Sequence, residues 1–179
     1  MVDLFNYTRR TSSVAHVGEL DLGGNNPIRI QSMTTTNTND TEACVRQAEE
    51  IIKAGGELVR FTTQGSREAE NMKNINAGIR ADGFTTPLVA DIHFNPNVAD
   101  VAALYCEKVR INPGNYVDPA RKFIKQEYTD EEYAHELQKI EERFVPFLNI
   151  CKENHTAIRI GVNHGSLSDR IRNRYGDTP

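Results

Sequence analysis

PLVADIHFNPNVADVAALYCEKVRIN, which spans residues 87–112, contains a complete strand–helix–strand pattern. The apolar run at 87–93 has the length of a buried strand, and a second run follows at 108–112. Between them, residues 97–105 read as a helix, and Pro96 suits its first turn. Short apolar runs that alternate with helices are typical of parallel sheets. This stretch therefore predicts a βα unit of an α/β fold.

The same alternation extends to both sides of this unit. Three further apolar runs, at 28–35, 58–63 and 157–162, are expected to form strands. The segments 41–54 and 66–81 are expected to be helices, because each begins with a capping residue. The chain should therefore contain five parallel strands joined by crossover connections.

Three segments lie outside this regular pattern. Residues 13–24 alternate apolar and polar residues around a glycine turn, which predicts a small β-hairpin that could plug the bottom of a barrel. Residues 119–152 are long and highly charged, and we expect a short helix followed by a long, surface-exposed one. After the fifth strand, 167–175 read as the start of one more helix.

The strand count determines the expected architecture. A TIM-type (β/α)8 barrel needs eight strands and typically about 250 residues. The chain has 179 residues, enough for about five strands. We therefore expect residues 1–179 to form one incomplete TIM-type barrel domain, the amino-terminal portion of a longer protein, preceded by the hairpin. An open doubly wound sheet is the structural alternative.

Composition narrows the class of protein. The formal net charge of -4 argues against nucleic-acid binding, which needs a basic face. We expect no membrane segment, because no apolar run approaches the length of about twenty residues that a span requires. The first residues lack the order of a secretory signal, so we expect a soluble, cytoplasmic protein. Cys44, Cys106 and Cys151 lie far apart in the chain, and we interpret them as reduced, buried thiols.

Arginine recurs between apolar residues in three of the predicted strands, at Arg60, Arg110 and Arg159. Neighbours in a strand point to opposite faces, so if the apolar residues face the helices the arginines point into the barrel. The repeated pattern suggests one register on all three strands. Acids adjacent on these strands are scarce, so an anionic ligand is the expected partner, and guanidinium groups suit phosphate oxygens.

Two other interpretations of these arginines remain open. They can lie at strand ends and reach solvent, or they can pair with acids elsewhere in the barrel. Arg29 has the same local pattern, but it lies earlier in its strand and is expected to be structural.

Polar segments follow each predicted strand, where the active sites of barrels are built. Asp91 and His93 alternate on one face and are candidates to hold a hydroxyl or move a proton, although a buried pair that only satisfies itself is the alternative. His164 and Ser166, at the start of the last helix, suit anion binding.

Five segments resemble, in order and spacing, those of the 4-hydroxy-3-methylbut-2-enyl diphosphate synthase family of isoprenoid (terpenoid) biosynthesis, the methylerythritol phosphate pathway. They are QSMTTTNTND, VRFTTQG, VADIHF, KVRINPGN and IRIGVNHGSLSDRI. The segment YTDEEYAHELQKIEERF is similar to the long form of the family, which carries an inserted middle domain.

The resemblance implies an iron–sulfur oxidoreductase that reductively converts 2-C-methyl-D-erythritol 2,4-cyclodiphosphate to 4-hydroxy-3-methylbut-2-enyl diphosphate. It implies a [4Fe-4S] cluster whose ligands lie beyond Pro179, ferredoxin or flavodoxin as electron donor, and a homodimer when full length. The cluster is not carried over to the cysteines of this chain, which on its own is expected to be inactive.

The resemblance also implies roles for individual residues. Arg60, Arg110 and Arg159, with Asn112 and Asn163, match family residues that face the diphosphate. Asp91 and His93 match polar residues at the pocket edge. Two rival interpretations stay open: a stand-alone half barrel that binds a phosphate ligand, and a barrel similar to pterin-dependent synthases.

Overall fold

The computed structural model describes residues 10–116, 128–163 and 167–176. Its elements, in chain order, are β1 (Val14–Val17), β2 (Leu20–Gly23), β3 (Gln31–Met33), α1 (Thr41–Lys53), β4 (Leu58–Thr62), α2 (Ser66–Ala81), β5 (Leu88–Asp91), α3 (Pro96–Ala102), β6 (Lys108–Ile111), the 3-10 turn η1 (Pro113–Asn115), α4 (Asp130–Glu153), β7 (Ala157–Ile160) and α5 (Asp169–Tyr175).

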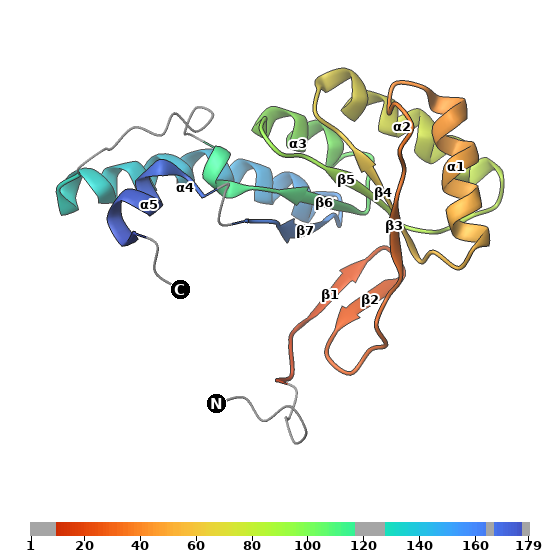
Figure 1. The fold of residues 1–179 in the computed structure, drawn as a ribbon, viewed down its shortest axis with the longest axis horizontal. Coiled ribbons are helices and arrows are strands. Elements are labelled where there is room, and N and C mark those ends of the chain that lie inside the picture. Colours follow the sequence, from red (N-terminus) through yellow and green to blue (C-terminus); the bar gives the residue numbers. More distant parts are fainter. Residues whose placement is uncertain (1–9, 117–127, 164–166, 177–179) are drawn as a thin grey trace.

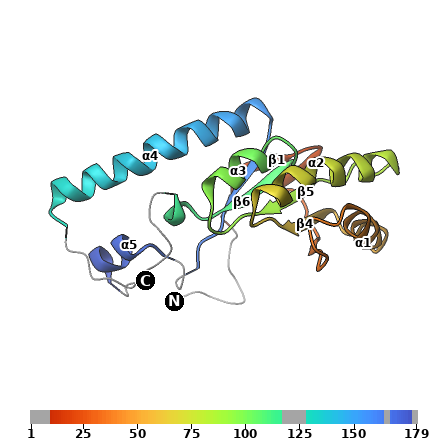
Figure 2. The ribbon, with the colours of Figure 1, turned by 90° about the horizontal axis from the view of Figure 1, so that it is seen from above.

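The five strands β3 to β7 form one parallel sheet in the order of the sequence (Figure 1). Helices α1 to α4 lie along one face of this sheet (Figure 2). Sequential order with all crossovers on one side is the arrangement of a barrel wall, whereas a doubly wound sheet has helices on both faces. The predicted α/β fold with five parallel strands is confirmed.

The apolar residues that flank the arginines face the helices. Val59, Phe61, Val109 and Ile111 are buried in the main core, packed against residues of α1 to α4 such as Phe147. Because side chains alternate along a strand, the polar residues between them must face the opposite, inner side of the sheet. The alternation in the sequence therefore determines which side chains can form a site.

The first strand of the sheet is shorter than predicted. Residues 28–35 were expected to be extended and paired, but β3 covers only Gln31–Met33, and Ile28 and Ile30 are 81% and 61% exposed. The carbonyl of Ile30 still accepts hydrogen bonds from the backbone N–H groups of Glu57 and Leu58. Among the described residues no strand lies on the other side of β3, so its apolar side chains are left at the edge.

The amino-terminal hairpin plugs the bottom of the sheet, as predicted. β1 and β2 pair antiparallel, and Val17 forms a small core with Leu58 and Val89. Leu20 and Leu22 pack against the same core. These contacts lie at the amino ends of the parallel strands, below the inner face. The hairpin therefore provides an apolar floor.

Two glutamates reinforce the amino ends in the same way. The Glu57 carboxylate accepts from the backbone N–H of Ile30 at 2.8 Å and from Arg29 at 2.9 Å. On the opposite side of β5, the Glu107 carboxylate accepts from the backbone N–H of Leu88 at 2.7 Å and from Arg80 at 2.8 Å. Each glutamate precedes one strand and fixes the start of its neighbour. The structural role expected for Arg29 is confirmed.

Helix α4 is the long helix expected in the charged segment. Thr129 and Glu132 exchange hydrogen bonds at its start in a capping box. Tyr133, Phe147 and Cys151 are buried, so only part of its surface is exposed. The shorter helix expected ahead of α4 lies outside the described residues.

Two helices begin or end differently from their predicted bounds. Helix α3 ends at Ala102 instead of continuing to residue 105, because the chain turns there toward β6. Helix α5 begins at Asp169 rather than at residue 167, and its buried Arg170 joins it to α4 by donating to the Glu136 carbonyl at 2.8 Å.

The predicted burial of the three cysteines is confirmed, and each is a free thiol. Burial raises the pKa of the Cys44, Cys106 and Cys151 thiols above the ordinary value. Within the described ranges, none of the helices combines the length and apolar character needed to cross a bilayer.

Candidate anion-binding site

The inner face of the sheet carries its cations in two layers. In parallel strands, residues that are partners in register point to the same face at the same height. Val89 is the partner of both Arg60 and Lys108, which places these three in the layer nearer the floor. Asp91 and Arg159 are both partners of Arg110, which places them in the layer nearer the carboxyl ends.

The expectation of one common register for the three arginines is therefore wrong. Arg110 and Arg159 are direct partners, but Arg60 lies one layer lower. The apolar–Arg–apolar pattern specifies the face of a side chain but contains nothing about the stagger between strands. The three arginines still converge on the inner face, but they occupy two layers instead of one.

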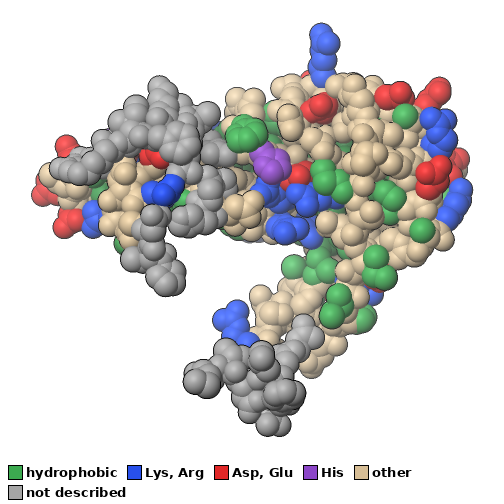
Figure 3. Space-filling view, in the orientation of Figure 1, with side chains coloured by type: hydrophobic (Ala, Val, Ile, Leu, Met, Phe, Trp, Pro, Cys, Tyr) green, Lys and Arg blue, Asp and Glu red, His purple; other side chains and the backbone are tan. Residues whose placement is uncertain are grey.

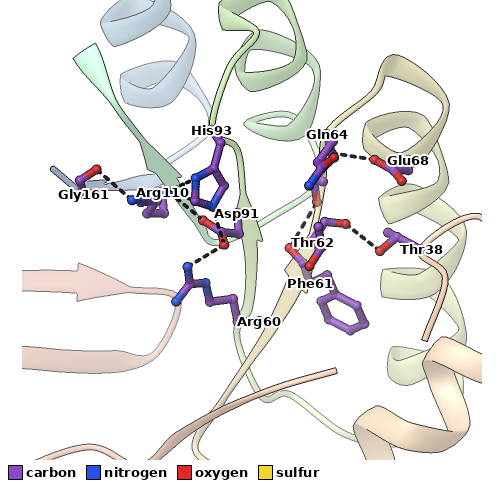
Figure 4. Close-up of polar contacts among 11 residues, drawn as sticks. Thr38, Arg60, Phe61, Thr62, Gln64, Glu68, Asp91, His93, Arg110 and Gly161 are labelled. Carbon is purple, nitrogen blue, oxygen red and sulfur yellow. Dashed lines mark hydrogen bonds and ion pairs between the residues drawn. The ribbon is translucent and has the colours of Figure 1, made fainter. Parts of the chain in front are cut away.

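Asp91 lies between two of the arginines (Figure 4). Its Oδ2 accepts from Nη2 of Arg60 at 2.5 Å, and its Oδ1 lies 3.4 Å from Nη1 of Arg110. The Asp91 side chain is buried, so this shared carboxylate is little screened by water. The expected scarcity of acids near these arginines is wrong at this point: of the two alternatives, pairing with an acid in the barrel applies to Arg60 and Arg110.

His93 completes the polar cluster from the carboxyl end of β5. Its Nε2 lies 3.1 Å from Oδ2 of Asp91, and Nη1 of Arg110 lies 2.8 Å from both ring nitrogens. A guanidinium can only donate, so the His93 nitrogen that faces Arg110 offers its lone pair. The structure brings Asp91, His93 and Arg110 together as a connected group.

Arg110 is held in place by the last strand as well. Its Nη2 donates to the carbonyl of Gly161 at 2.8 Å, and the side chain is buried. A Cβ on residue 161 would lie 2.0 Å from Nε of Arg110. Glycine is therefore required at position 161 for this arginine to adopt its position, a role that the sequence analysis missed.

Two of the arginines keep donors for a ligand. The Nε of Arg60 is buried and has no hydrogen-bond partner in the described part of the chain. Arg159 is exposed, and no hydrogen bond or ion pair ties it to another described residue. A buried donor without an acceptor is unfavourable, so Nε of Arg60 suits an additional anion. The exposed guanidinium of Arg159 is open to solvent and to a ligand.

Lys108 is a further inner-face cation that the sequence analysis missed. It precedes Arg110 by two residues in β6, so strand alternation already indicated that both point to the same face. Burial lowers the pKa of the Lys108 ammonium group, and the nearby charges of Arg159 and Arg60 lower it further. No carboxylate within the described ranges forms an ion pair with it.

The two asparagines occupy different environments. Asn112 is buried, its Oδ1 accepts from the backbone N–H of Gly114 at 3.2 Å, and it lines a small pocket with His93 and Tyr116. Asn163 is exposed beyond the end of β7. The other two candidates in this loop, His164 and Ser166, lie outside the described residues.

The loop after β3 is largely occupied with its own structure. Thr38 is buried and its hydroxyl donates to the carbonyl of Thr62 at 2.6 Å, while the hydroxyl of Thr34 lies 3.4 Å from the carbonyl oxygen of Arg60. These hydroxyls therefore position the loop. Figure 3 shows where the charged residues lie instead: Lys and Arg side chains gather on the face seen there, above the hairpin and next to a histidine.

Parallel strands with helices outside and cations inside define this chain as a barrel-type βα domain with a cationic inner face. Among such domains its family can be identified. A family profile described as GcpE TIM-barrel domain matches residues 11–179, and the chain belongs to this family.

Relatives of high identity carry the name 4-hydroxy-3-methylbut-2-en-1-yl diphosphate synthase (flavodoxin). The protein of Phocaeicola vulgatus is 75% identical over 178 residues, which cover 99% of this chain and 29% of that protein. The protein of Bacteroides thetaiotaomicron is 74% identical with the same coverage. That of Akkermansia muciniphila is 53% identical over 175 residues, 98% of this chain and 30% of that protein. The chain thus spans less than a third of the length of these curated relatives.

The alignment with a solved structure of 7,8-dihydropteroate synthase from Vibrio fischeri ES114 covers 90% of this chain and 72% of the synthase chain. Its TM-score is 0.43 and its sequence identity is 15%, and this likeness is too weak to bear on the assignment.

The cysteines do not fit an iron–sulfur cluster. Each is buried separately, Cys44 in α1, Cys106 ahead of β6 and Cys151 in α4. Across residues 10–116, 128–163 and 167–176, no group of three His, Cys, Asp or Glu side chains is placed to hold a metal ion.

Proposed function

We propose that this chain is the amino-terminal part of the substrate-binding barrel of a 4-hydroxy-3-methylbut-2-en-1-yl diphosphate synthase, and that its inner face binds the diphosphate of 2-C-methyl-D-erythritol 2,4-cyclodiphosphate. The observation that carries this proposal is the excess of cations on the inner face. Arg60, Lys108, Arg110 and Arg159 converge there. Asp91 pairs with Arg60 and Arg110, and no carboxylate in the described part of the chain pairs with Lys108 or Arg159.

Each side chain has a distinct task in this proposal. Arg159 and the spare Nε of Arg60 donate to phosphate oxygens. Arg110 is already anchored by Gly161 and Asp91, so it presents a fixed charge and loses little freedom on binding. Asn112 and Asn163 are proposed to face the diphosphate as well, and His164 and Ser166 to add donors for it.

Asp91 and His93 are the proton-handling pair of the proposal. One ring nitrogen of His93 accepts from Arg110 and Nε2 contacts Asp91, so both neighbours orient the imidazole. Loss of a hydroxyl as water from the ligand requires a proton. The pair lies at the carboxyl end of β5, beside the upper cation layer.

The remaining parts of the activity belong to the longer protein. Residues 1–179 form an incomplete barrel in this proposal, and the further strands and the [4Fe-4S] domain lie outside this chain. The cluster would supply the electrons for reductive ring opening and would be held by residues outside this chain. The relatives' printed name supports flavodoxin as the electron donor. We propose a cytoplasmic homodimer as the complete enzyme, and no turnover by this chain alone.

The test is calorimetric titration of the chain with the cyclodiphosphate and, separately, with inorganic diphosphate. Saturable binding is expected, and Arg159→Ala should weaken it by about tenfold, since one charge-assisted contact is lost. Because Arg159 is exposed and unpaired with other described residues, the melting temperature should not fall.

Arg46→Ala is the matched control, because Arg46 is an exposed arginine on α1, on the helix side of the sheet. It should bind like the unaltered chain. Equal affinity of the Arg159→Ala and Arg46→Ala variants, in protein shown to be folded by circular dichroism, would contradict the proposed site.

A further inference from the structure

We propose that Lys108 is an additional binding residue of this anion site, and that its ammonium group contacts the most deeply inserted phosphate oxygens from below. The inference rests on the proposed function, because it extends the same site by one layer toward the floor. Lys108 does not belong to the recurring arginine pattern, and it does not pair with the shared carboxylate of Asp91.

The position of Lys108 follows from strand pairing. Its register partners are Val89 on one side and Ala157 on the other. Val89 belongs to the apolar floor, and Ala157 packs against it. The carbon stem of Lys108 therefore starts beside the apolar floor, and its ammonium group lies near the charges of Arg159 and Arg60. No other position on β6 brings a charge this close to the floor.

The surroundings of Lys108 are unfavourable for a cation without a ligand. Arg60 lies in the same layer and Arg159 in the layer above, on the strands to either side of β5 and β6. Their like charges and the partial burial of the amine both disfavour the ammonium form. Asp91, which lies on the neighbouring strand β5 one layer above Lys108, is already shared by Arg60 and Arg110.

A structural role would place a carboxylate beside Lys108, as Glu57 does for Arg29 and Glu107 does for Arg80. No described residue does so. The register partner of Lys108 on β7 is Ala157, whose small side chain offers the amine no acceptor. A phosphate oxygen would supply the missing charge and relieve the repulsion among the three cations.

This arrangement predicts opposite effects on stability and binding, which a structural lysine would not show. Lys108→Met keeps the length of the stem and removes the charge. Without ligand, the variant should melt about 2–4 °C higher than the unaltered chain, because a repelled and partly buried charge is gone. Its affinity for inorganic diphosphate in calorimetry should fall by about tenfold.

Lys108→Arg and Lys152→Met serve as controls. Lys108→Arg retains a cation and should keep most of the affinity. Lys152→Met removes an exposed lysine from the last turn of α4 and should change neither quantity by a measurable amount.

The outcomes separate this inference from the proposed function. If Lys108→Met melts lower, or binds diphosphate as well as the unaltered chain while Arg159→Ala binds weakly, the role of Lys108 is refuted and the anion site stands. If the folded, unaltered chain does not bind diphosphate, both are refuted. A higher melting temperature together with weaker binding supports the inference.

Discussion

Gly161 and Arg110 share one small volume of the inner face. The carbonyl of Gly161 accepts from Nη2 of Arg110, and the guanidinium lies where a side chain on residue 161 would begin. The residue directly after β7 thus controls the position of a cation on β6 through the absence of a side chain.

Gly161→Ala is therefore expected to displace Arg110. The added methyl group would overlap Nε and the carbon atoms next to it, and overpacking of this kind costs about 1–3 kcal/mol of stability. Displacement should also break the contacts with Asp91 and His93, so affinity for diphosphate should fall. Chemical denaturation and calorimetry measure the two effects.

A second glycine separates strain from displacement. Gly83 has a φ of +85° and open space around its Cα, so Gly83→Ala strains the backbone without touching the site. It should lose stability and keep its diphosphate affinity. The interpretation of Gly161 fails if both variants bind diphosphate equally well.

Asp91→Asn tests the shared carboxylate. Removing its charge leaves Arg60 and Arg110 facing each other, and breaking a buried pair costs about 3 kcal/mol or more. Inorganic diphosphate should raise the melting temperature of this variant more than that of the unaltered chain, because the added anion replaces the lost charge. Thermal melts with and without diphosphate measure this difference.

Asp100→Asn is the comparison for that experiment. Asp100 pairs with Arg143 at 2.7 Å, away from the inner face. Its variant should show the same gain from diphosphate as the unaltered chain. An equal gain in the Asp91 and Asp100 variants would exclude competition between the carboxylate and the ligand.

Acid sensitivity should arise in part at Glu57. Its hydrogen bond from the backbone of Ile30, together with Arg29, lowers the pKa of the Glu57 carboxyl below its ordinary value of 4.5. A lowered folded-state pKa gives stability that is fully present above pH 4.5 and is lost as the pH falls through the folded-state value. The difference in melting temperature between the unaltered chain and Glu57→Gln should shrink below pH 4.5. Glu70→Gln, an exposed change on α2, should show no such dependence.

The two edges of the sheet should promote self-association of this chain. Ile28 is 81% exposed near β3, and Ile160 is 54% exposed on β7. Exposed apolar edge strands are templates for pairing with another copy. Sedimentation velocity should show concentration-dependent association, which Ile28→Lys combined with Ile160→Lys reduces. Leu137, which lies on α4, is 47% exposed in the unaltered chain. Leu137→Lys should leave the association unchanged if the sheet edges are responsible.

Strand faces were predictable from the sequence, and strand heights were not. The period of two in Val59-Arg60-Phe61 and Val109-Arg110-Ile111 was sufficient to separate core from inner face. The stagger that lowers Arg60 by one layer comes from the pairing of β4 with β5, which depends on packing across the whole sheet. The same period of two places Lys108 on the inner face with Arg110.

The side-chain contacts within the site could not be predicted from the sequence either. Asp91 alternates with His93 as expected, but its contact with arginines from two other strands requires those strands to be neighbours. The space reserved by Gly161 depends on the rotamer of a residue 51 positions earlier. Side-chain contacts between elements distant in the chain follow from the tertiary arrangement, so local patterns contain little of them.

The hairpin floor gives the inner face a direction of entry. Val17, Leu58 and Val89 close the amino ends with apolar side chains. Arg60 and Lys108 lie beside Val89, and Arg110 and Arg159 lie one layer higher. Under the proposed function, a ligand arrives from the opposite end with its phosphates leading and its carbon skeleton trailing. The bond to be reduced then stays near the mouth, within reach of a partner that brings electrons and never has to enter the barrel.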